Sequence, residues 1–293
     1  MACCAALERL TYSSFEVFIC ENGGPAAFAI LQNMLPETLS RGQSIHYVLA
    51  PGNLGYAGGV NFAMNINQAA NCWWILNPDA RPQPDALTAM IARLSGGNCD
   101  AVGGILYHEN NVVQAYGGRW RGWLARSESI GIGARLDDPV IAEAIERSMN
   151  YLLGASMLVT QEFMRSVGPM REDYFLYCEE VEWFLRALQR GMRLGFAPQS
   201  LVEHAQGGTT GSASAIRERP KLPIYLDERN KLNVVRDTTP LRLPVAIFAA
   251  LVLLTLRYLK QGALRSWWYA LSGWWAGVRG QRGIPDWLAD THR

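Results

Sequence analysis

Short apolar runs rich in strand formers alternate with stretches of helical spacing through roughly the first 210 residues. Three of these runs, Phe15–Cys20, Ile45–Leu49 and Cys72–Leu76, are each followed by polar or turn residues. This alternation predicts an α/β protein with a mostly parallel sheet flanked by helices. In open sheets of this kind, ligands bind beyond the carboxyl ends of the strands, so the residues after these runs are the first candidates for a site.

The same alternation continues toward the middle of the chain. The further predicted strands are Ala101–Leu106 and Tyr151–Val159, and the predicted helices are Gln83–Leu94, Gln161–Val167 and Val181–Gln189, the last ending at Gly191 as a C-cap. Residues 107–150 contain many Gly and Arg and have no clear period, so we expect an irregular loop region there.

The pattern changes after Pro220, and we divide the chain into a catalytic domain, residues 1–220, and a helical region, residues 221–293. Leu243–Leu256 is an apolar run that would form a helix of about 21 Å, too short to cross a membrane core of about 30 Å. Five of the ten tryptophans follow it, mixed with Arg, as in helices that lie at a membrane surface. Packing of these helices on the catalytic domain or on another copy of the chain is the alternative.

Charge separates the same two regions. The whole chain of 293 residues has a net charge of +1, which argues against a general nucleic-acid binder, but the residues from Leu241 onward carry +5. A basic tail on a mildly acidic body favours contact with anionic lipid. The six cysteines show no CxxC spacing, so we expect reduced thiols rather than a disulfide framework or a zinc site.

Two acidic segments are candidates for chemistry. Asn77-Pro78-Asp79 follows a predicted strand, and a carboxylate there would suit Mg²⁺ or Mn²⁺, which prefer oxygen ligands. Taken alone, this tripeptide is also a common turn. Glu179, Glu180 and Glu182 begin a predicted helix, where carboxylates either interact with the helix dipole or serve as a base.

Two further segments are weaker candidates. Asn53 begins the glycine-rich run NLGYAGGVN, whose backbone N–H groups would suit a phosphate at a helix N-terminus, although the run is neither a P-loop nor GxGxxG. His204 follows a strand-like segment, and a single histidine in such a place is more often structural than a ligand.

The order and spacing of several segments resemble the family 2 glycosyltransferases of the GT-A fold, most closely their bacterial rhamnosyltransferase-like branch. The resemblance covers about residues 5–235 and rests on VFICENGG, NLGYAGGVN, WWILNPD, NYLLGASMLV, GPMREDYFLYCEEVEWFLR and APQSLVEH.

This resemblance implies a role for each candidate residue. Glu21, Asn53, Asn77 and Asp79 would bind the donor, with Glu21 in contact with the nucleobase. Asp79 and His204 would bind Mg²⁺ or Mn²⁺. Glu180, beside Glu179, would be the general base. Gly154, Ala155 and Trp183 would lie on the acceptor side.

The activity implied is inverting transfer of a sugar from a nucleoside diphosphate donor, dTDP-rhamnose or a UDP-hexose, to a cell-surface glycan or lipid-linked acceptor. We expect a cytoplasmic, peripheral location at the inner face of a bacterial plasma membrane, with no nucleic-acid partner and with a homo-oligomer left open. The alternatives are a non-catalytic relative that binds nucleotide sugars or scaffolds polysaccharide assembly, and a nucleotidyltransferase, for which a glycine-rich N-terminal loop is lacking.

One departure from the family concerns the N-terminus. The family's first strand has no counterpart here, and we expect that the recorded start lies downstream of the natural one, since losing an inner strand would leave backbone groups unpaired.

Overall fold

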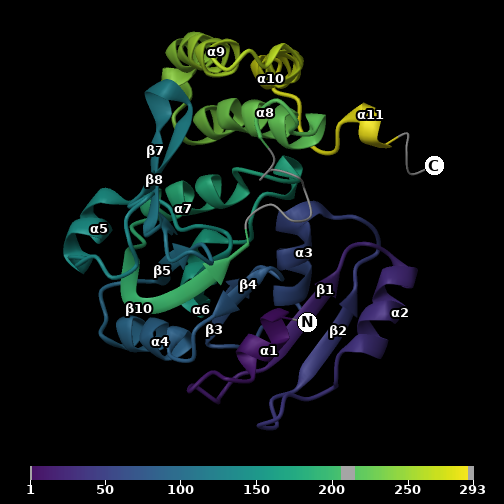
Figure 1. Ribbon diagram of the computed structural model, residues 1–293, viewed down its shortest axis with the longest axis vertical. Helices are drawn as coiled ribbons and strands as arrows, with labels where there is room; N and C mark the ends of the chain where they lie inside the picture. The colour runs from purple at the N-terminus through teal and green to yellow at the C-terminus, as the bar shows by residue number, and fades with distance from the viewer. Residues whose placement is uncertain (1, 206–214, 290–293) are drawn as a thin grey trace.

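The computed structural model describes residues 2–205 and 215–289, and it has an α/β core with a group of helices at one end (Figure 1). The strands are β1 (Val17–Glu21), β2 (Ile45–Leu49), β3 (Cys72–Leu76), β4 (Ala80–Pro82), β5 (Ala101–Tyr107), β6 (Val113–Ala115), β7 (Gly117–Arg121), β8 (Arg126–Ile130), β9 (Ser156–Thr160) and β10 (Leu194–His204). The α/β class predicted from the sequence is confirmed.

The helices alternate with these strands and then continue alone. They are α1 (Ala2–Leu7), α2 (Pro25–Met34), α3 (Gly55–Met64), α4 (Ala86–Ser95), α5 (Ala142–Ser148), α6 (Gln161–Val167), α7 (Glu179–Gln189), α8 (Lys221–Thr238), α9 (Leu243–Leu259), α10 (Leu264–Val278) and α11 (Asp286–Ala289). Short 3₁₀ turns are η1 (Gly122–Leu124), η2 (Glu172–Tyr174) and η3 (Pro240–Arg242).

The central sheet is mixed rather than mostly parallel. Its strand order is β3-β9-β5-β10-β4, with β6 paired to β5. Only β5 and β10 pair in parallel, because β9 enters between β3 and β5 in the opposite direction. A separate parallel pair, β1 and β2, lies to one side; within the described residues no strand pairs with the second edge of β1 or of β3.

The prediction that residues 107–150 form an irregular loop is wrong in part. It contains β6, the β7–β8 hairpin and α5. The hairpin reaches toward α9 in Figure 1, and Gly118 faces the ring of Tyr151 so closely that a Cβ would lie 1.9 Å from it. Close contacts of this kind stabilise the strands of this region, and the local sequence pattern does not reveal them. The predicted strand Tyr151–Val159 is also shorter than expected, since β9 begins only at Ser156.

The C-terminal helices lie together at the end of the molecule opposite β2 (Figure 1). α8 begins at Lys221 and its middle is buried, in contact with α7 and α10. The apolar helix α9 has 17 residues rather than the 14 predicted from the sequence. The division of the chain at residue 220 stays a prediction.

Candidate functional site

Glu179 and Glu180 begin α7 directly after a turn of unusual backbone geometry. Phe175, Tyr177 and Cys178 have φ angles of 67°, 71° and 70°, a left-handed conformation that non-glycine residues adopt at a cost. The side chain of Glu179 is buried, at 3% exposure, and its Oε2 has no hydrogen-bond partner among the described residues. Glu180 is partly exposed, so it is the acid that a substrate can reach.

The environments of the two acids favour different protonation states. Burial, followed by the neighbouring Glu180, raises the pKa of Glu179 well above its usual range, so Glu179 is held neutral. Burial raises the pKa of Glu180 to about 7, while backbone N–H groups at the start of α7 lower it. A carboxylate with a pKa near the working pH suits a general base.

A second cluster lies at the end of the central sheet, where β3 and β10 terminate. His204 Nε2 is 3.3 Å from Asp79 Oδ1 and 3.4 Å from Asn77 Nδ2. The side chain of Asp79 is 32% exposed, whereas His204 is buried. Burial lowers the pKa of His204, although Asp79 raises it, so the imidazole is held toward its neutral, metal-binding form.

The orientation of His204 is set by a residue that the sequence analysis missed. Gln114 Oε1, on β6, lies 3.0 Å from His204 Nδ1. Gln114 Nε2 donates to the His204 carbonyl and lies 2.8 Å from His108 Nδ1. With the Nδ1 proton directed to Gln114, the Nε2 lone pair faces Asp79. No sequence signal identified Gln114, because its segment has no clear period and was predicted as a loop.

These residues fit a divalent cation in part. Asp79 and His204 supply one oxygen and one nitrogen ligand, and Asn77 lies beside them. No group of three or more His, Cys, Asp or Glu that would hold a metal occurs in the part of the chain that the structure describes. Two protein ligands are compatible with an ion that takes its remaining ligands from water and a diphosphate.

A chain of contacts connects the two clusters. Asn77 N donates to the carbonyl of Ala155 at 3.0 Å, and Tyr56 Oη donates to the carbonyl of Gly154 at 2.5 Å. The backbone N–H of Tyr56 also donates to the carbonyl of Phe175 at 2.8 Å, in the turn that precedes Glu179. Burial, then Glu179 and Glu180, raise the pKa of Tyr56 well above its usual range. Tyr56, also missed from the sequence, therefore lies between the two clusters. The convergence of Asp79 and Glu180 on one cleft stays a prediction.

The predicted donor residues Glu21 and Asn53 lie near the start of α3. Glu21, at the end of β1, accepts from Gly23 N at 2.5 Å, and Asn53 accepts from Gly55 N at 3.1 Å. Gly55 has φ +70°, and a Cβ there would lie 2.1 Å from the carbonyl oxygen of Phe175. Glycine is therefore required because α3 begins against the turn that precedes Glu179.

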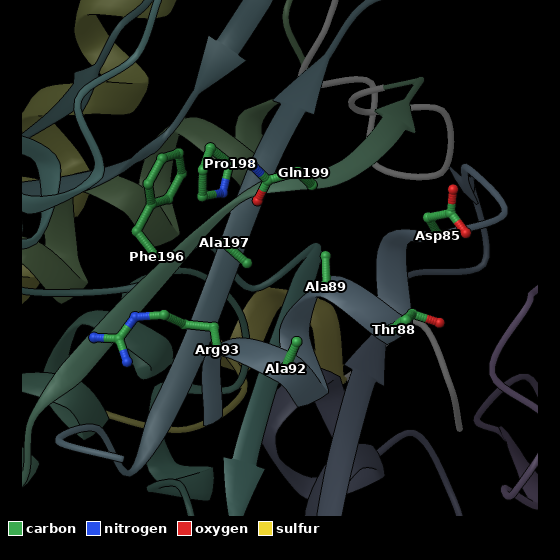
Figure 2. Close-up of a pocket in the computed structure, with 9 residues that line it drawn as sticks. All are labelled: Asp85, Thr88, Ala89, Ala92, Arg93, Phe196, Ala197, Pro198 and Gln199. Carbon is green, nitrogen blue, oxygen red and sulfur yellow. The ribbon is translucent and has the colours of Figure 1, made fainter. Parts of the chain in front are cut away.

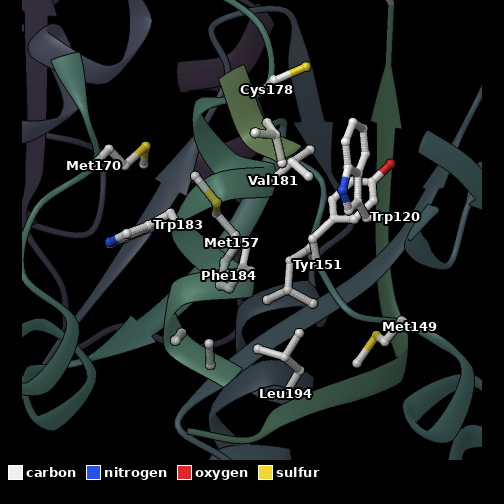
Figure 3. Packing of buried hydrophobic residues seen from close by; sticks show 14 of the residues in the cluster. Trp120, Met149, Tyr151, Met157, Met170, Cys178, Val181, Trp183, Phe184 and Leu194 are labelled. Atoms are coloured by element: carbon white, nitrogen blue, oxygen red, sulfur yellow. The ribbon is translucent and has the colours of Figure 1, made fainter. Parts of the chain in front are cut away.

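The prediction that Trp183 lies on the acceptor side is wrong. Its indole is fully buried, packs edge-on against Phe163, and donates to the carbonyl of Gly168 at 2.8 Å. Figure 3 shows it inside the hydrophobic core beside Phe184. The indole fails to reach solvent because α7 turns this apolar face toward the core.

A separate hollow of about 360 Å³ lies between α4 and β10, with Thr88, Arg93 and Phe196 among its lining residues (Figure 2). None of the predicted site residues lines it. It is distinct from the two clusters described above.

Comparison with known proteins agrees with this fold. The sequence model of Glycosyl transferase family 2 matches residues 2–144. The low-salt glycan biosynthesis hexosyltransferase Agl10 of Haloferax volcanii is 23% identical over 216 residues, which are 71% of this chain and 66% of the relative. The chain thus spans just under two thirds of that relative's length.

Two solved structures share the fold at low identity. The mannosyltransferase PcManGT from Pyrobaculum calidifontis, solved in complex with GDP-Man and Mn²⁺, has a TM-score of 0.51 at 13% identity, covering 94% of this chain and 81% of that one. Residues 1–349 of S. aureus TarS give a TM-score of 0.51 at 11% identity, covering 93% of this chain and 75% of that one.

Proposed function

We propose that the chain is an inverting glycosyltransferase that moves a hexose from a nucleoside diphosphate to a glycan or lipid-linked acceptor, because residues 2–144 match the sequence model of Glycosyl transferase family 2 and the chain has a GT-A-like fold. The observation that carries the proposal is that Tyr56 contacts the surroundings of two clusters, Asp79 with His204 and Glu180 with Glu179: its hydroxyl donates to the Gly154 carbonyl, and its backbone N–H donates to the Phe175 carbonyl in the turn before Glu179. One cluster suits a diphosphate-bound cation, and the other suits proton removal.

The proposed reaction is a direct displacement. Glu180 takes the proton of the acceptor hydroxyl as that oxygen forms a bond to the anomeric carbon, and the bond from this carbon to the diphosphate breaks on the opposite face. Glu179, held neutral, does not compete for this proton. Mg²⁺ or Mn²⁺ bound at Asp79 and His204 would neutralise negative charge on the departing diphosphate.

Binding of a donor is expected to raise the melting temperature of the protein. A ligand at one hundred times its Kd stabilises the native state by about 2.7 kcal/mol, or about 5 °C for a chain of this size. A thermal-shift screen with Mn²⁺ would compare dTDP-rhamnose, predicted from the sequence resemblance, with UDP-glucose and with GDP-mannose, the donor bound by PcManGT.

A shift with one donor that disappears with a chelator is the expected result, and release of the nucleoside diphosphate should follow. A shift without any release would favour the alternative of a non-catalytic nucleotide-sugar-binding relative. No shift with any of the three donors would contradict the proposed donor class.

We also propose that the protein works at a membrane surface, on the cytoplasmic side, through its C-terminal helices. One side of α9 packs inward through Ala246, Ala250, Leu254 and Tyr258. Its other side exposes a row of apolar residues at helical spacing, Val245, Phe248, Val252, Leu256 and Leu259, and the exposed Leu241 of η3 precedes them. Trp268 and Trp275 of α10, the helix that packs beside α9, are exposed as well.

Basic residues accompany the apolar face, as anionic lipid would require. Arg242 stacks over the exposed Trp123 of η1 with 5.1 Å between the guanidinium carbon and the ring centre, and Arg257, Lys260 and Arg265 follow along α9 and α10. Within the described residues, one segment, Pro240–Leu259, has the length and hydropathy of a membrane-crossing helix. We favour a helix lying in the membrane plane, because crossing would remove α9 from Trp274, which donates to the carbonyl of Ile247.

The double substitution Phe248→Glu with Leu256→Glu is expected to weaken vesicle binding by tenfold or more, since each apolar side chain contributes about 1.5–3 kcal/mol when buried. Co-flotation with vesicles that contain phosphatidylglycerol would measure this. The matched control is Ile132→Glu, which replaces a residue that is 73% exposed outside the C-terminal helices. Equal binding of both variants would contradict a membrane-binding face, and resistance of the wild type to alkaline extraction would indicate a crossing helix instead.

A further inference from the structure

A buried asparagine of the C-terminal helices contacts the turn that precedes Glu179. Asn230 of α8 is fully buried, and its Nδ2 lies 3.0 Å, 2.8 Å and 2.8 Å from the carbonyl oxygens of Tyr174, Leu176 and Tyr177. The two N–H bonds of this amide are thus shared among three of the five carbonyls of residues 174–178, the segment that leads into α7.

Arg229 fixes the orientation of this amide. Its Nε donates to Asn230 Oδ1 at 2.9 Å, and its Nη2 donates to the Tyr174 carbonyl at 3.1 Å. Since the oxygen of Asn230 accepts from Arg229, its NH₂ group must point to the turn. A third guanidinium contact, from Nη1 to the carbonyl of Gly283 at 2.7 Å, anchors Arg229 itself.

The turn needs such support because its own backbone is strained. Left-handed conformations at three residues, Phe175, Tyr177 and Cys178, persist only where the surroundings determine them. The ring of Phe175 packs in one apolar cluster with Tyr225 and Leu226 of α8. Without Asn230, the carbonyls of Leu176 and Tyr177 would each lose this donor beside the cluster, which is unfavourable.

We propose that Asn230 is a positioning residue for the general base: by holding three carbonyls of the 174–178 turn, it fixes the direction in which the backbone enters α7 and so aims Glu180 at the acceptor. The inference rests on the proposed function of Glu180. It also implies that the C-terminal helices complete the active site instead of serving only as an attachment to the membrane.

Asn230→Leu is the test, and Asn233→Leu is its matched control. Asn233 lies three residues further along α8, is equally buried, and donates to a backbone carbonyl as well, but its partner is Gln281 at 3.0 Å, outside the turn. Both variants lose an amide from the same helix, so both are expected to lower the melting temperature.

Steady-state hydrolysis of dTDP-rhamnose, UDP-glucose and GDP-mannose with Mn²⁺ would separate the two variants. We expect Asn230→Leu to lower kcat by about 10²-fold with the donor KM little changed, as small misplacements of catalytic groups do. Asn233→Leu should keep the kcat of the wild type. An equal loss of kcat in both variants, or no loss in Asn230→Leu, would overturn the proposal.

Two further measurements keep the proposal testable if Asn230→Leu does not fold or if the wild type is inactive. Arg229→Lys keeps the charge but releases Asn230 Oδ1, so it should lower kcat in the same way; unchanged kcat would count against the proposal. Amide hydrogen exchange of residues 174–182 should increase in Asn230→Leu and not in Asn233→Leu. If the wild type hydrolyses no donor, the proposed function fails. If amide exchange of residues 174–182 is unchanged in Asn230→Leu, Asn230 does not stabilise the turn, and the present inference fails whether or not the enzyme is active.

Discussion

Replacing Glu180 with Gln is expected to lower turnover by about 10²- to 10⁴-fold, the usual size of a general-base effect, while donor binding is retained. Glutamine keeps the size of the side chain and one acceptor oxygen, but its amide accepts no proton from the acceptor hydroxyl. Donor binding should persist because the predicted donor residues Asp79 and Glu21 lie on other elements. Turnover of donor at saturating concentration and the donor-induced thermal shift would measure the two effects.

The pH dependence of the wild type provides a second measurement of the same role. Since burial raises the pKa of Glu180 to about 7, the base is ionised only above that pH, and kcat/KM should rise as pH increases through about 7. The pKa of Glu180 is higher in the folded protein than in the unfolded chain. The free energy of unfolding therefore falls as the pH rises to about 7 and Glu180 loses its proton. Glu180→Gln should therefore lose the acid limb and be at least as stable as the wild type at pH 8.

Glu182→Gln is the matched control on the same helix. Glu182 is buried and forms a two-pronged ion pair with Arg186, with distances of 2.8 Å and 3.0 Å. Its replacement should lower the melting temperature and keep turnover, the reverse of the result expected for Glu180→Gln. Undiminished turnover in Glu180→Gln would remove the proposed base.

The elements that the sequence predicted correctly have strong local signals. Ile45–Leu49, Cys72–Leu76 and Gln161–Val167 were predicted with the bounds that the structure has. The first two are runs of strand formers that end at turn residues. The helix begins at a threonine cap, where Thr160 Oγ1 accepts from Phe163 N at 3.0 Å, and it ends at Gly168.

Long-range packing decided the parts that the sequence did not predict. The 107–150 region folds because Trp120 and Tyr151 are buried against distant residues, and the local composition of Gly and Arg gave no period. Gln114, Tyr56 and Asn230 were missed for the same reason: each acts through a partner 50 to 100 residues away, at His204, Gly154 and Tyr174.

The wrong assignment of Trp183 has a related cause. Its neighbours Glu179 and Glu180 belong to a candidate catalytic motif, but side chains three and four positions apart on a helix point to one face. Trp183 therefore follows Glu179 toward the interior, whereas Glu180 stays partly exposed. Order along the chain identified the motif but could not tell which of its members face the core.

Asp79→Asn is expected to abolish the Mn²⁺-dependent part of the donor thermal shift and to lower turnover by about 10²-fold or more, since a metal contributes several kcal/mol of charge stabilisation in such reactions. Asparagine is nearly isosteric and stays close to His204, but it lacks the negative charge that a hard cation requires. Thermal shifts with donor, with and without Mn²⁺, would measure the first effect, and donor turnover would measure the second.

Asp137→Asn is the appropriate control, because Asp137 is an exposed acid whose ion pair is with the nearby Arg135. It removes one negative charge from the protein and should leave both the Mn²⁺ dependence and the turnover unchanged. If Asp79→Asn still responds to Mn²⁺ as the wild type does, the ion is bound elsewhere, and the contact between Asp79 and His204 has only a structural role. A loss of turnover with the Mn²⁺ response intact would instead assign Asp79 to direct contact with the donor.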